Sequence, residues 1–536
     1  MKITDAFRIF FPYILILWVP FFAGCATPDH WDVFETRPEN QMPEEDIAVN
    51  TPEIIQYPQV AESLPDIAES SGPVDLTIEQ AVMLTLRNNR DLAVREVNPA
   101  IAGTFARIER GEYDPEVFAQ MEYFEEKATE TSRATGEQFG VQGEDVEAVA
   151  GIRQKLPTGT DIEVALEHDR SRSDRAPDQQ TARVGLSVTQ SLLRGFGPAV
   201  NLVSVRQAEL DVLASIYELR GFTEALLADT EIAYWQYVLT EQEIAIFEES
   251  LSVVEQERDE IEQKIDVGLL PKTEAAAARA QVATHEQSLI DARSLLEERR
   301  LKLLRKISME SDRQFEYKIN ATSDPFVRPE PITDLSDRLA LADQSRPDLN
   351  EARLRKKQNR LETIVTRNGL MPELDLFVAL GRTGYADNFS DSFRELDSNT
   401  YDFSAGIRLS SYVGNRSAKA KDYAARLSWR QTADAVANLA QMIELQVRLA
   451  VNEVERTRQQ ISASRATRVL EEEKLQAEIE RFDVGAGTSL LVAQARRDLL
   501  ISRIAEVRSV VNYRMALVNL YLAEGSLLER RAVSIE

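Results

Sequence analysis

The chain lacks the residues on which catalytic and metal sites are usually built. It has one cysteine and three histidines, His30, His168 and His285, in 536 residues. A disulfide within the chain is therefore impossible, and histidines so far apart in sequence do not form a usual zinc site. The sequence also contains no zincin helix, Walker loop, dinucleotide-binding glycine pattern or serine elbow. We expect no enzyme activity, no metal and no cofactor.

Basic charge is also scarce. Lysine and arginine total 62 against 89 aspartates and glutamates, which gives a formal charge of −27. This excludes a nucleic-acid binder, because no basic field exists to displace counterions from phosphate. The acidity otherwise indicates a surface that keeps the protein soluble. The more specific alternative is an interior that favours cations. Acidic neighbours such as Glu255, Glu257 and Asp259 are interpreted as a solvated helix face.

The chain begins like an exported lipoprotein. Two basic residues precede an apolar run over 9–22, which is too short for a comfortable membrane span. The run ends in Phe22-Ala23-Gly24-Cys25, which resembles a bacterial lipobox. We predict a signal peptide over 1–24, a lipidated Cys25 and an extended acidic tether over 25–74. The alternative is a plain signal peptide with an incidental cysteine.

Two long proline-free runs organise the remaining sequence. One leads from Pro198 to Val267-Gly268 and the other from Asn415 to Val484-Gly485, each over 69 residues. At the helical rise this is roughly 100 Å. A second helical pattern follows each Val-Gly pair. We predict two long antiparallel helical hairpins, over 198–306 and 415–523, whose narrow apolar seams need partner helices.

The rest of the chain is duplicated in the same way. Asp91-Leu92 and Pro115 recur 257 residues later as Asp348-Leu349 and Pro372. Asp75 or Thr77 is a candidate cap for a helix that starts at Ile78. The predicted domains are a first repeat over 75–308, a linker over 309–331, a second repeat over 332–525 and a C-terminal tail over 526–536.

Each repeat also contains strand patterns. Alternating polar and apolar residues predict a β-hairpin over 372–411 and another over 116–192. The second offset is 217 rather than 257, so the hairpin of the first repeat is longer by 40 residues. Part of this excess, 146–156 and 161–167, is itself strand-like. It is either a second hairpin in the same wall or a β-rich loop outside it, and the sequence does not decide between them.

These strands predict an oligomer. Weakly amphipathic segments of about ten residues are typical of outer-membrane barrel walls. Four strands, or six with the insertion, are too few to close a membrane barrel, and lipid does not tolerate open strand edges. We therefore predict an α+β membrane protein in which a trimer forms a transmembrane β-barrel and a periplasmic α-barrel. Four strands per chain give a barrel of twelve strands, and the insertion would raise the number to six strands per chain.

Markers spread over both repeats resemble the TolC family of outer-membrane efflux proteins. The resemblance covers about residues 76–525 and implies a homotrimer in the outer membrane with a helical tunnel across the periplasm. It also implies two partners, a periplasmic adaptor protein and an inner-membrane pump. The markers are Leu76-Thr77-Ile78-Glu79-Gln80-Ala81, Leu193-Arg194-Gly195-Phe196-Gly197, Ala233-Tyr234-Trp235, Arg346-Pro347-Asp348-Leu349, Met371-Pro372-Glu373-Leu374 and Arg481-Phe482-Asp483-Val484-Gly485 with Thr488-Ser489.

The resemblance places the Val-Gly breaks at the periplasmic tip of the tunnel, where the adaptor binds. It also implies an aperture there, but the acidic residues that family members often carry after the second break are missing from Ser489 to Gln494. An apolar or polar constriction is the expected substitute. The implied adaptor contacts are Val267, Gly268, Leu269, Val484, Gly485 and Ala486, and the aperture candidates are Asp266, Asp483, Leu491 and Gln494.

The predicted function is a passive conduit of a tripartite efflux or type I secretion system, anchored in the outer membrane of a Gram-negative-type bacterium. The sequence does not distinguish the efflux of small molecules from the secretion of proteins. The alternative class is a structural lipoprotein that spans the periplasm without a pore, and membrane-height strands argue against it. Tyr234, Trp235 and Tyr237 are interpreted as core residues between helices rather than tunnel-lining residues.

Overall fold

The structure, a computed structural model, describes residues 55–56, 73–174, 176–307 and 314–535. The predicted signal peptide, Cys25 and nearly all of the predicted tether lie outside these residues. Within them, no helix is both long and apolar enough to cross a bilayer.

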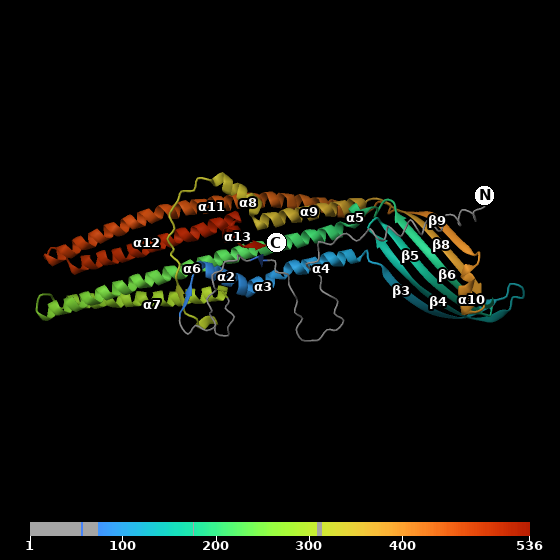
Figure 1. The fold of residues 1–536 in the computed structure, drawn as a ribbon, viewed down its shortest axis with the longest axis horizontal. Helices are drawn as coiled ribbons and strands as arrows, with labels where there is room; N and C mark the ends of the chain where they lie inside the picture. Colours follow the sequence, from blue (N-terminus) through green and yellow to red (C-terminus); the bar gives the residue numbers. More distant parts are fainter. Residues whose placement is uncertain (1–54, 57–72, 175, 308–313, 536) are drawn as a thin grey trace. The chain divides into compact units, whose positions relative to one another are not determined.

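Two long helical hairpins dominate the fold (Figure 1). In the first, α5 (Pro198–Asn201) leads into α6 (Val203–Asp266, 64 residues), and α7 (Thr273–Ile307) runs back along α6. In the second, α11 (Arg416–Asp483, 68 residues) is followed by α12 (Ser489–Glu524). Absence of proline lets both long helices continue for roughly 100 Å.

Shorter helices flank the hairpins. They are α2 (Ile78–Asn88), α3 (Arg90–Glu96), α4 (Asn98–Gly111), α8 (Leu335–Ser345) and α9 (Pro347–Asn368). Thr77, rather than Asp75, caps α2: its hydroxyl accepts from the Gln80 amide, and the Gln80 side chain accepts from the Thr77 amide. This reciprocal pair satisfies two amides that the first helical turn would leave unbonded.

The helices are arranged in rows. Near the hairpin tips, contacts link α7 to α6, α6 to α12 and α12 to α11. Nearer the sheet, they link α4 to α6, α6 to α9 and α9 to α11. One side of the described chain is therefore bordered by α4 and α7, and the other side by α11.

The main core lies where the two rows meet. Tyr234, Trp235 and Tyr237 are buried there, together with Leu303 and Leu304 of α7. The hydroxyl of Tyr234 donates to the Leu76 carbonyl at 2.8 Å, and that of Tyr237 donates to the Ile319 carbonyl at 2.7 Å. The interpretation of the three aromatic residues as core residues is confirmed.

Six strands of the described chain form one antiparallel sheet in the order β3-β4-β5-β6-β8-β9. This sheet has six strands in a single chain, and the structure does not by itself make all six of them barrel strands. The 40-residue excess of the first repeat supplies β4 and β5 within the sheet. The strands are β3 (Glu116–Thr131), β4 (Gln138–Leu156), β5 (Thr160–Ser173), β6 (Ala176–Ser191), β8 (Glu373–Ala386) and β9 (Tyr401–Ser410).

Some local structure was not predicted. The polar connection between β8 and β9 contains a short helix, α10 (Phe389–Arg394), and a 3₁₀ turn, η4 (Glu395–Asp397). Asn388 caps α10 by accepting from the Asp391 amide at 3.0 Å. A single capping residue in a polar loop is a weak signal against a background of turn residues.

The ends of the described chain are paired with distant segments. Strand β1 (Ile55–Gln56) pairs antiparallel with β10 (Ser534–Ile535), and β2 (Val74–Leu76) pairs parallel with β7 (Ile319–Ala321). The predicted linker also contains η3 (Gln314–Glu316), and the tail contains α13 (Leu527–Arg530).

Candidate functional site: hairpin tips and a two-faced sheet

The turn of the first hairpin is a Schellman motif. Gly268 adopts φ 81°, a left-handed conformation that favours glycine. The Leu269 amide donates to the Lys264 carbonyl at 2.8 Å, and the Gly268 amide donates to the Ile265 carbonyl at 2.9 Å. These bonds satisfy carbonyls that the end of α6 would otherwise leave unpaired.

The turn of the second hairpin repeats this geometry. Gly485 has φ 74°. The Ala486 amide donates to the Arg481 carbonyl at 2.8 Å, and the Gly485 amide donates to the Phe482 carbonyl at 3.0 Å. The two Val-Gly pairs therefore end their helices by the same backbone mechanism.

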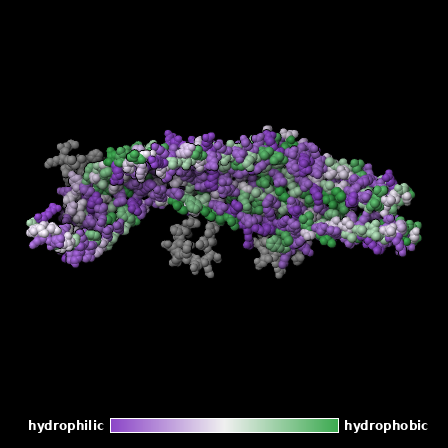
Figure 2. Space-filling model, turned by 180° about the vertical axis from the view of Figure 1, so that it is seen from behind, coloured by the Kyte–Doolittle hydropathy of each residue, from purple (hydrophilic) through white to green (hydrophobic). Residues whose placement is uncertain are grey.

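Both turns present apolar side chains to solvent. Val267 is 71% exposed, Leu269 74% and Val484 78%. An exposed apolar cluster at a loop tip indicates a contact surface. Figure 2 shows hydrophobic surface at the hairpin ends among hydrophilic helices.

The aperture candidates lie on the same ends. Asp266 is the last residue of α6 and is exposed, while Asp483 ends α11 and its side chain lies outside the described residues. Leu491 and Gln494 are exposed on the first turns of α12, where the Leu491 amide donates to the Thr488 side chain.

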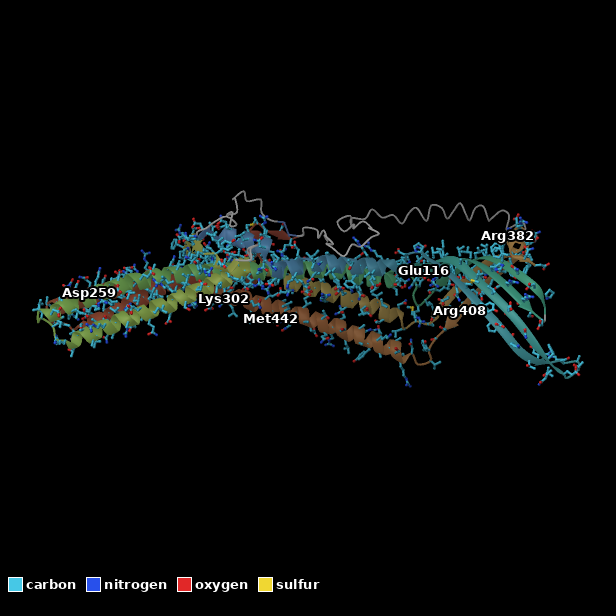
Figure 3. All side chains as sticks on the ribbon, turned by 90° about the horizontal axis from the view of Figure 1, so that it is seen from below. Glu116, Asp259, Lys302, Arg382, Arg408 and Met442 are labelled. Atoms are coloured by element: carbon cyan, nitrogen blue, oxygen red, sulfur yellow. The ribbon has the colours of Figure 1, made fainter. Side chains whose placement is uncertain are left out.

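The two tips contact one another. The Ser489 hydroxyl, at the start of α12, donates to Glu274, at the start of α7, at 2.5 Å. The Lys264 ammonium lies 6.0 Å from the centre of the Phe482 ring. In Figure 3, Asp259 of α6 lies close to this end of the hairpins.

Ion pairs join the hairpins along α6 and α12. Glu257 pairs with Arg496 at 2.9 Å, Glu249 with Arg503 at 2.9 Å and Glu243 with Arg508 at 2.7 Å. The interpretation of Glu257 as part of a solvated face is wrong, because this carboxylate is largely covered and its burial raises its pKa against the opposing effect of Arg496. The charges were visible in the sequence, but their pairing depends on the packing register of two distant helices.

A second group of charges is buried farther from the tips. Glu231 is fully buried and forms a two-bond pair with Arg531, at 2.7 and 2.6 Å, which ties the C-terminal segment to α6. Glu224 is also buried, and burial raises its pKa to about 7 although Arg220 lies 3.6 Å away. The loss of hydration outweighs the attraction to the guanidinium at this site.

The sheet has two chemically different faces. One residue from each strand forms a continuous apolar row across its full width: Val117, Ile152, Val164, Leu186, Leu380 and Phe403. Because neighbouring residues of a strand point to opposite faces, the adjacent row lies on the other side. That row is mostly polar: Glu116, Arg153, Glu163, Ser187, Ala379 and Ser404.

Ion pairs cross the polar face. Arg153 makes two bonds to Glu116, at 2.8 and 2.9 Å. Arg183 bridges Glu167 on β5 and Asp402 on β9, reaching over Gly381 of the intervening strand. A side chain at Gly381 would collide with this bridge. These contacts indicate a face built for water.

The described residues contain no group of three or more His, Cys, Asp or Glu side chains placed to hold a metal ion. The distinctive surfaces of the described residues are two exposed apolar tips and a sheet with one apolar and one charged face. An apolar face on a two-edged sheet, joined to long polar helices, is the arrangement expected where strands meet lipid.

Comparisons with known proteins match the sequence of part of the chain and the fold of most of it. The domain formed by residues 339–526 matches the outer membrane efflux protein family. No curated protein matches the chain significantly. The resemblance to the TolC family is confirmed through this domain and through the fold.

Solved structures share the fold at low sequence identity. The CmeC outer membrane channel of Campylobacter jejuni has a TM-score of 0.62 at 16% identity, covering 91% of this chain and 94% of CmeC. The outer membrane protein VceC of Vibrio cholerae gives 0.61 at 15%, covering 84% and 96%. The open-state MtrE outer membrane channel of Neisseria gonorrhoeae gives 0.58 at 18%, covering 84% and 89%. CmeC and MtrE are described as outer membrane channels, and VceC as an outer membrane protein.

Proposed function

We propose that this chain is the outer-membrane channel of a tripartite efflux or type I secretion system. Three copies form a passive conduit across the outer membrane and the periplasm, and an adaptor and a pump open it at the hairpin tips. The observation that carries this proposal is the two-faced sheet with open edges, attached to two long hairpins with equivalent tips.

The apolar face of the sheet fits outer-membrane lipid. Its exposed side chains include Val117, Ile152, Val164 and Phe403. Strands of 9–11 residues suffice to cross a bilayer, and all six strands reach this length. The charged face then borders an aqueous lumen, as in outer-membrane channels.

The edges of the chain support assembly with further copies. Exposed apolar residues lie on α4, which borders one side, and on α11, which borders the other. Each set would remain in water in a single chain. Packing α11 of one copy against α4 and α7 of the next is a head-to-tail contact, which closes into a ring. The exposed residues are Ile101, Phe105 and Ile108 on α4, and Met442, Leu445 and Leu449 on α11.

The hairpin tips are the proposed adaptor site. Val267, Leu269 and Val484 supply apolar contact, while Gly268, Gly485 and Ala486 shape the turns. Opening is a shift of one hairpin against the other, which requires the α6–α12 ion pairs to separate. Such sliding of packed helices is a common form of conformational switching.

Lipidation of Cys25 would add an anchor in the outer membrane. Fully extended, the residues between Cys25 and β1 could span at most about 100 Å. Replacing Cys25 with Ser should abolish lipid labelling of the protein, and unchanged labelling would exclude lipidation at this cysteine.

A periplasm-spanning lipoprotein without a pore is the rival proposal. Such a spacer has no use for an apolar row that continues across every strand of a sheet, because both faces of that sheet would be in water. The two-faced sheet therefore favours the channel.

Planar-bilayer conductance tests the proposal. Purified oligomers should give small, cation-preferring currents that grow when the tip ion pairs are removed by Arg496→Met and Arg503→Met. The matched control is Arg279→Met, which removes a pair within one hairpin, between Arg279 of α7 and Glu262 of α6. Absence of current from correctly folded oligomers, with and without the tip substitutions, would favour the spacer.

A further inference from the structure

We infer that β4 and β5 are membrane-spanning strands of the barrel wall, so that a trimer of this chain closes on eighteen strands. This inference rests on the proposed channel function and concerns the width of its barrel. The competing arrangement keeps β4 and β5 outside the wall, pairs β3 directly with β6 and gives twelve strands in a trimer.

Each inserted strand is hydrogen-bonded to a neighbour on both sides, so the sheet is continuous from β3 to β6. β3 pairs with β4 from Glu116 to Thr131, β4 pairs with β5 from Gly143 to Leu156, and β5 pairs with β6 from Thr160 onward. The insertion therefore lies between β3 and β6 and separates them by two strands.

The inserted strands also have a lipid-compatible face. On β5, Ile162, Val164 and Leu166 share the face of the apolar row, whereas Asp161 and Glu163 lie on the polar face. A hairpin outside the membrane has water on both faces and gains nothing from this alternation. The apolar row continues across all six strands, and contact of β4 and β5 with lipid explains this continuity.

The turn between β4 and β5 is built into the junction between sheet and helices. The Gly197 amide donates to the Thr158 carbonyl at 3.0 Å, and the Ser191 amide donates to the Gly159 carbonyl at 2.9 Å. Asn201 of α5 donates to the Pro157 carbonyl at 3.0 Å. The turn is therefore held by the corner through which β6 enters the first long helix.

Gly159 shows how close this contact is. It adopts φ 81°, and a Cβ atom there would stand well inside van der Waals distance of the Gly195 carbonyl oxygen. Asn201 also donates to that oxygen, at 2.8 Å. A loop that only decorated the wall would not require its turn to be packed against the backbone of the corner.

The sheet and the helices end at matching borders. β3 directly follows α4 on one side of the chain, and β9 directly precedes α11 on the other. The six strands alternate in direction, so β9 of one copy and β3 of the next meet antiparallel, and the same ring that closes the helices closes the sheet. In Figure 3, Glu116 lies where α4 meets the sheet.

Eighteen strands give a wider lumen. Barrel diameter grows roughly linearly with strand number, and barrels of about 16–18 strands enclose an aqueous channel. Going from twelve to eighteen strands therefore widens the barrel by about one half and increases its cross-section by about twofold. The constriction of this conduit would then lie in the helical part rather than in the barrel.

Engineered disulfides test the strand order in the intact protein. Neighbouring antiparallel strands hold Cα atoms at about 4.5–5.5 Å, within reach of a disulfide, whereas a separation of three strand spacings is about 14 Å. Glu163→Cys with Ser187→Cys joins β5 to β6 and should cross-link. Glu116→Cys combined in turn with Gly185→Cys, Ser187→Cys and Thr189→Cys probes β3 against β6 and should not. Cross-linking of any β3–β6 pair would overturn the inference.

Electron cryomicroscopy of full-length trimers in lipid nanodiscs counts the strands. Eighteen strands support the inference. A membrane-inserted trimer with twelve strands overturns it and leaves the channel function intact, whereas a particle without any barrel overturns the channel function itself.

A matched glycine pair tests the junction. Gly159→Ala should reduce the yield of heat-resistant trimer by several-fold. Gly136→Ala, in the β3–β4 turn, imposes a similar positive φ but has open space around its Cβ, and should have a much smaller effect. Equal yields from the two variants would show that the β4–β5 turn is not part of the wall.

Discussion

The two repeats are alike at one end of their helical hairpins and different at the other. At the tips, Gly268 and Gly485 end their helices with the same two hydrogen bonds. At the sheet, the first repeat contributes β3, β4, β5 and β6, whereas the second contributes β8 and β9. The two repeats are therefore alike where the hairpins turn and unlike in the sheet.

The difference follows from what each end must satisfy. A helix that reverses tightly needs a left-handed residue, and glycine supplies it at least cost. An antiparallel sheet accepts another hairpin wherever the new strands keep the same alternation and pair on both sides. The sheet can therefore gain a hairpin without any change at the tips.

The largest expected effect comes from a charge placed on the apolar face of the sheet. It can be compared between the inserted strand β5 and strand β8 of the second repeat. Val164→Arg on β5 and Leu380→Arg on β8 place a charge on the apolar row, at a cost of about 2–4 kcal/mol if these positions lie deep in the bilayer. Both variants should lose most heat-resistant trimer on gels. Glu163→Arg, one residue away on the polar face, is the control and should retain it. A harmless Val164→Arg together with a harmful Leu380→Arg would place β5 outside lipid.

The next effect concerns a carboxylate that only the first repeat has. Glu224 on α6 corresponds to Gln441 on α11 at the offset of 217 residues that relates the hairpins. Its pKa is raised from 4.5 to about 7 in the folded protein. The folded state therefore holds this proton more tightly than the unfolded state does, and stability falls as pH rises from about 4.5 to about 7.

Glu224→Gln should remove this pH dependence and stabilise the protein by about 2 kcal/mol at pH 8, with little change at pH 4. The measurement is the unfolding temperature of both proteins between pH 4 and 8. Parallel curves would mean that Glu224 is not the group responsible.

A smaller effect is expected from the ion pairs between hairpins. Arg496→Glu faces Glu257 with a like charge and should destabilise the contact by about 1–2 kcal/mol, because both groups are partly covered. Reversing both charges, Arg496→Glu with Glu257→Arg, should restore it. The readout is the rate of cross-linking between cysteines placed on the two hairpins. If the double variant does not regain the rate of the unchanged protein, the destabilisation does not come from this ion pair.

The smallest effect tests the likeness of the tips. Gly268→Ala and Gly485→Ala each force a side chain into a left-handed conformation, at a cost of about 1 kcal/mol. The two variants should lower trimer heat resistance equally. Gly103→Ala, within α4 and with open space around it, is the control and should be neutral or slightly stabilising. If the two variants lose heat resistance to different extents, one turn carries strain that the other does not.

Much of this fold could be predicted from residue pattern. Uninterrupted helical periodicity, the paired Val-Gly breaks and the recurrence of Asp91-Leu92 as Asp348-Leu349 indicated two long hairpins on a duplicated chain. Thr77 followed by Gln80 has the form of a capping box. These features are local, so sequence spacing alone defines them.

What escaped prediction depends on distant contacts. Alternation marked Ile162, Val164 and Leu166 as a strand but did not name its neighbours, so the position of the insertion remained open. The pairing of Glu257 with Arg496 depends on the register of α6 against α12, which neither helix encodes by itself. Asp266 and Gln494 remain predicted aperture residues, because in the proposed trimer an aperture depends on contacts between copies.

A disulfide between β9 of one copy and β3 of the next tests most directly whether copies of this chain share one barrel wall, as proposed. With Glu116→Cys on the free edge of β3 and cysteines placed in turn at Ile407, Arg408, Leu409 and Ser410 on the free edge of β9, oxidation in the membrane should produce covalent dimers and trimers. At least one pair should yield a closed trimer that migrates as a single species after heating. Monomers alone from every pair, in protein that is folded and membrane-inserted, would contradict the account.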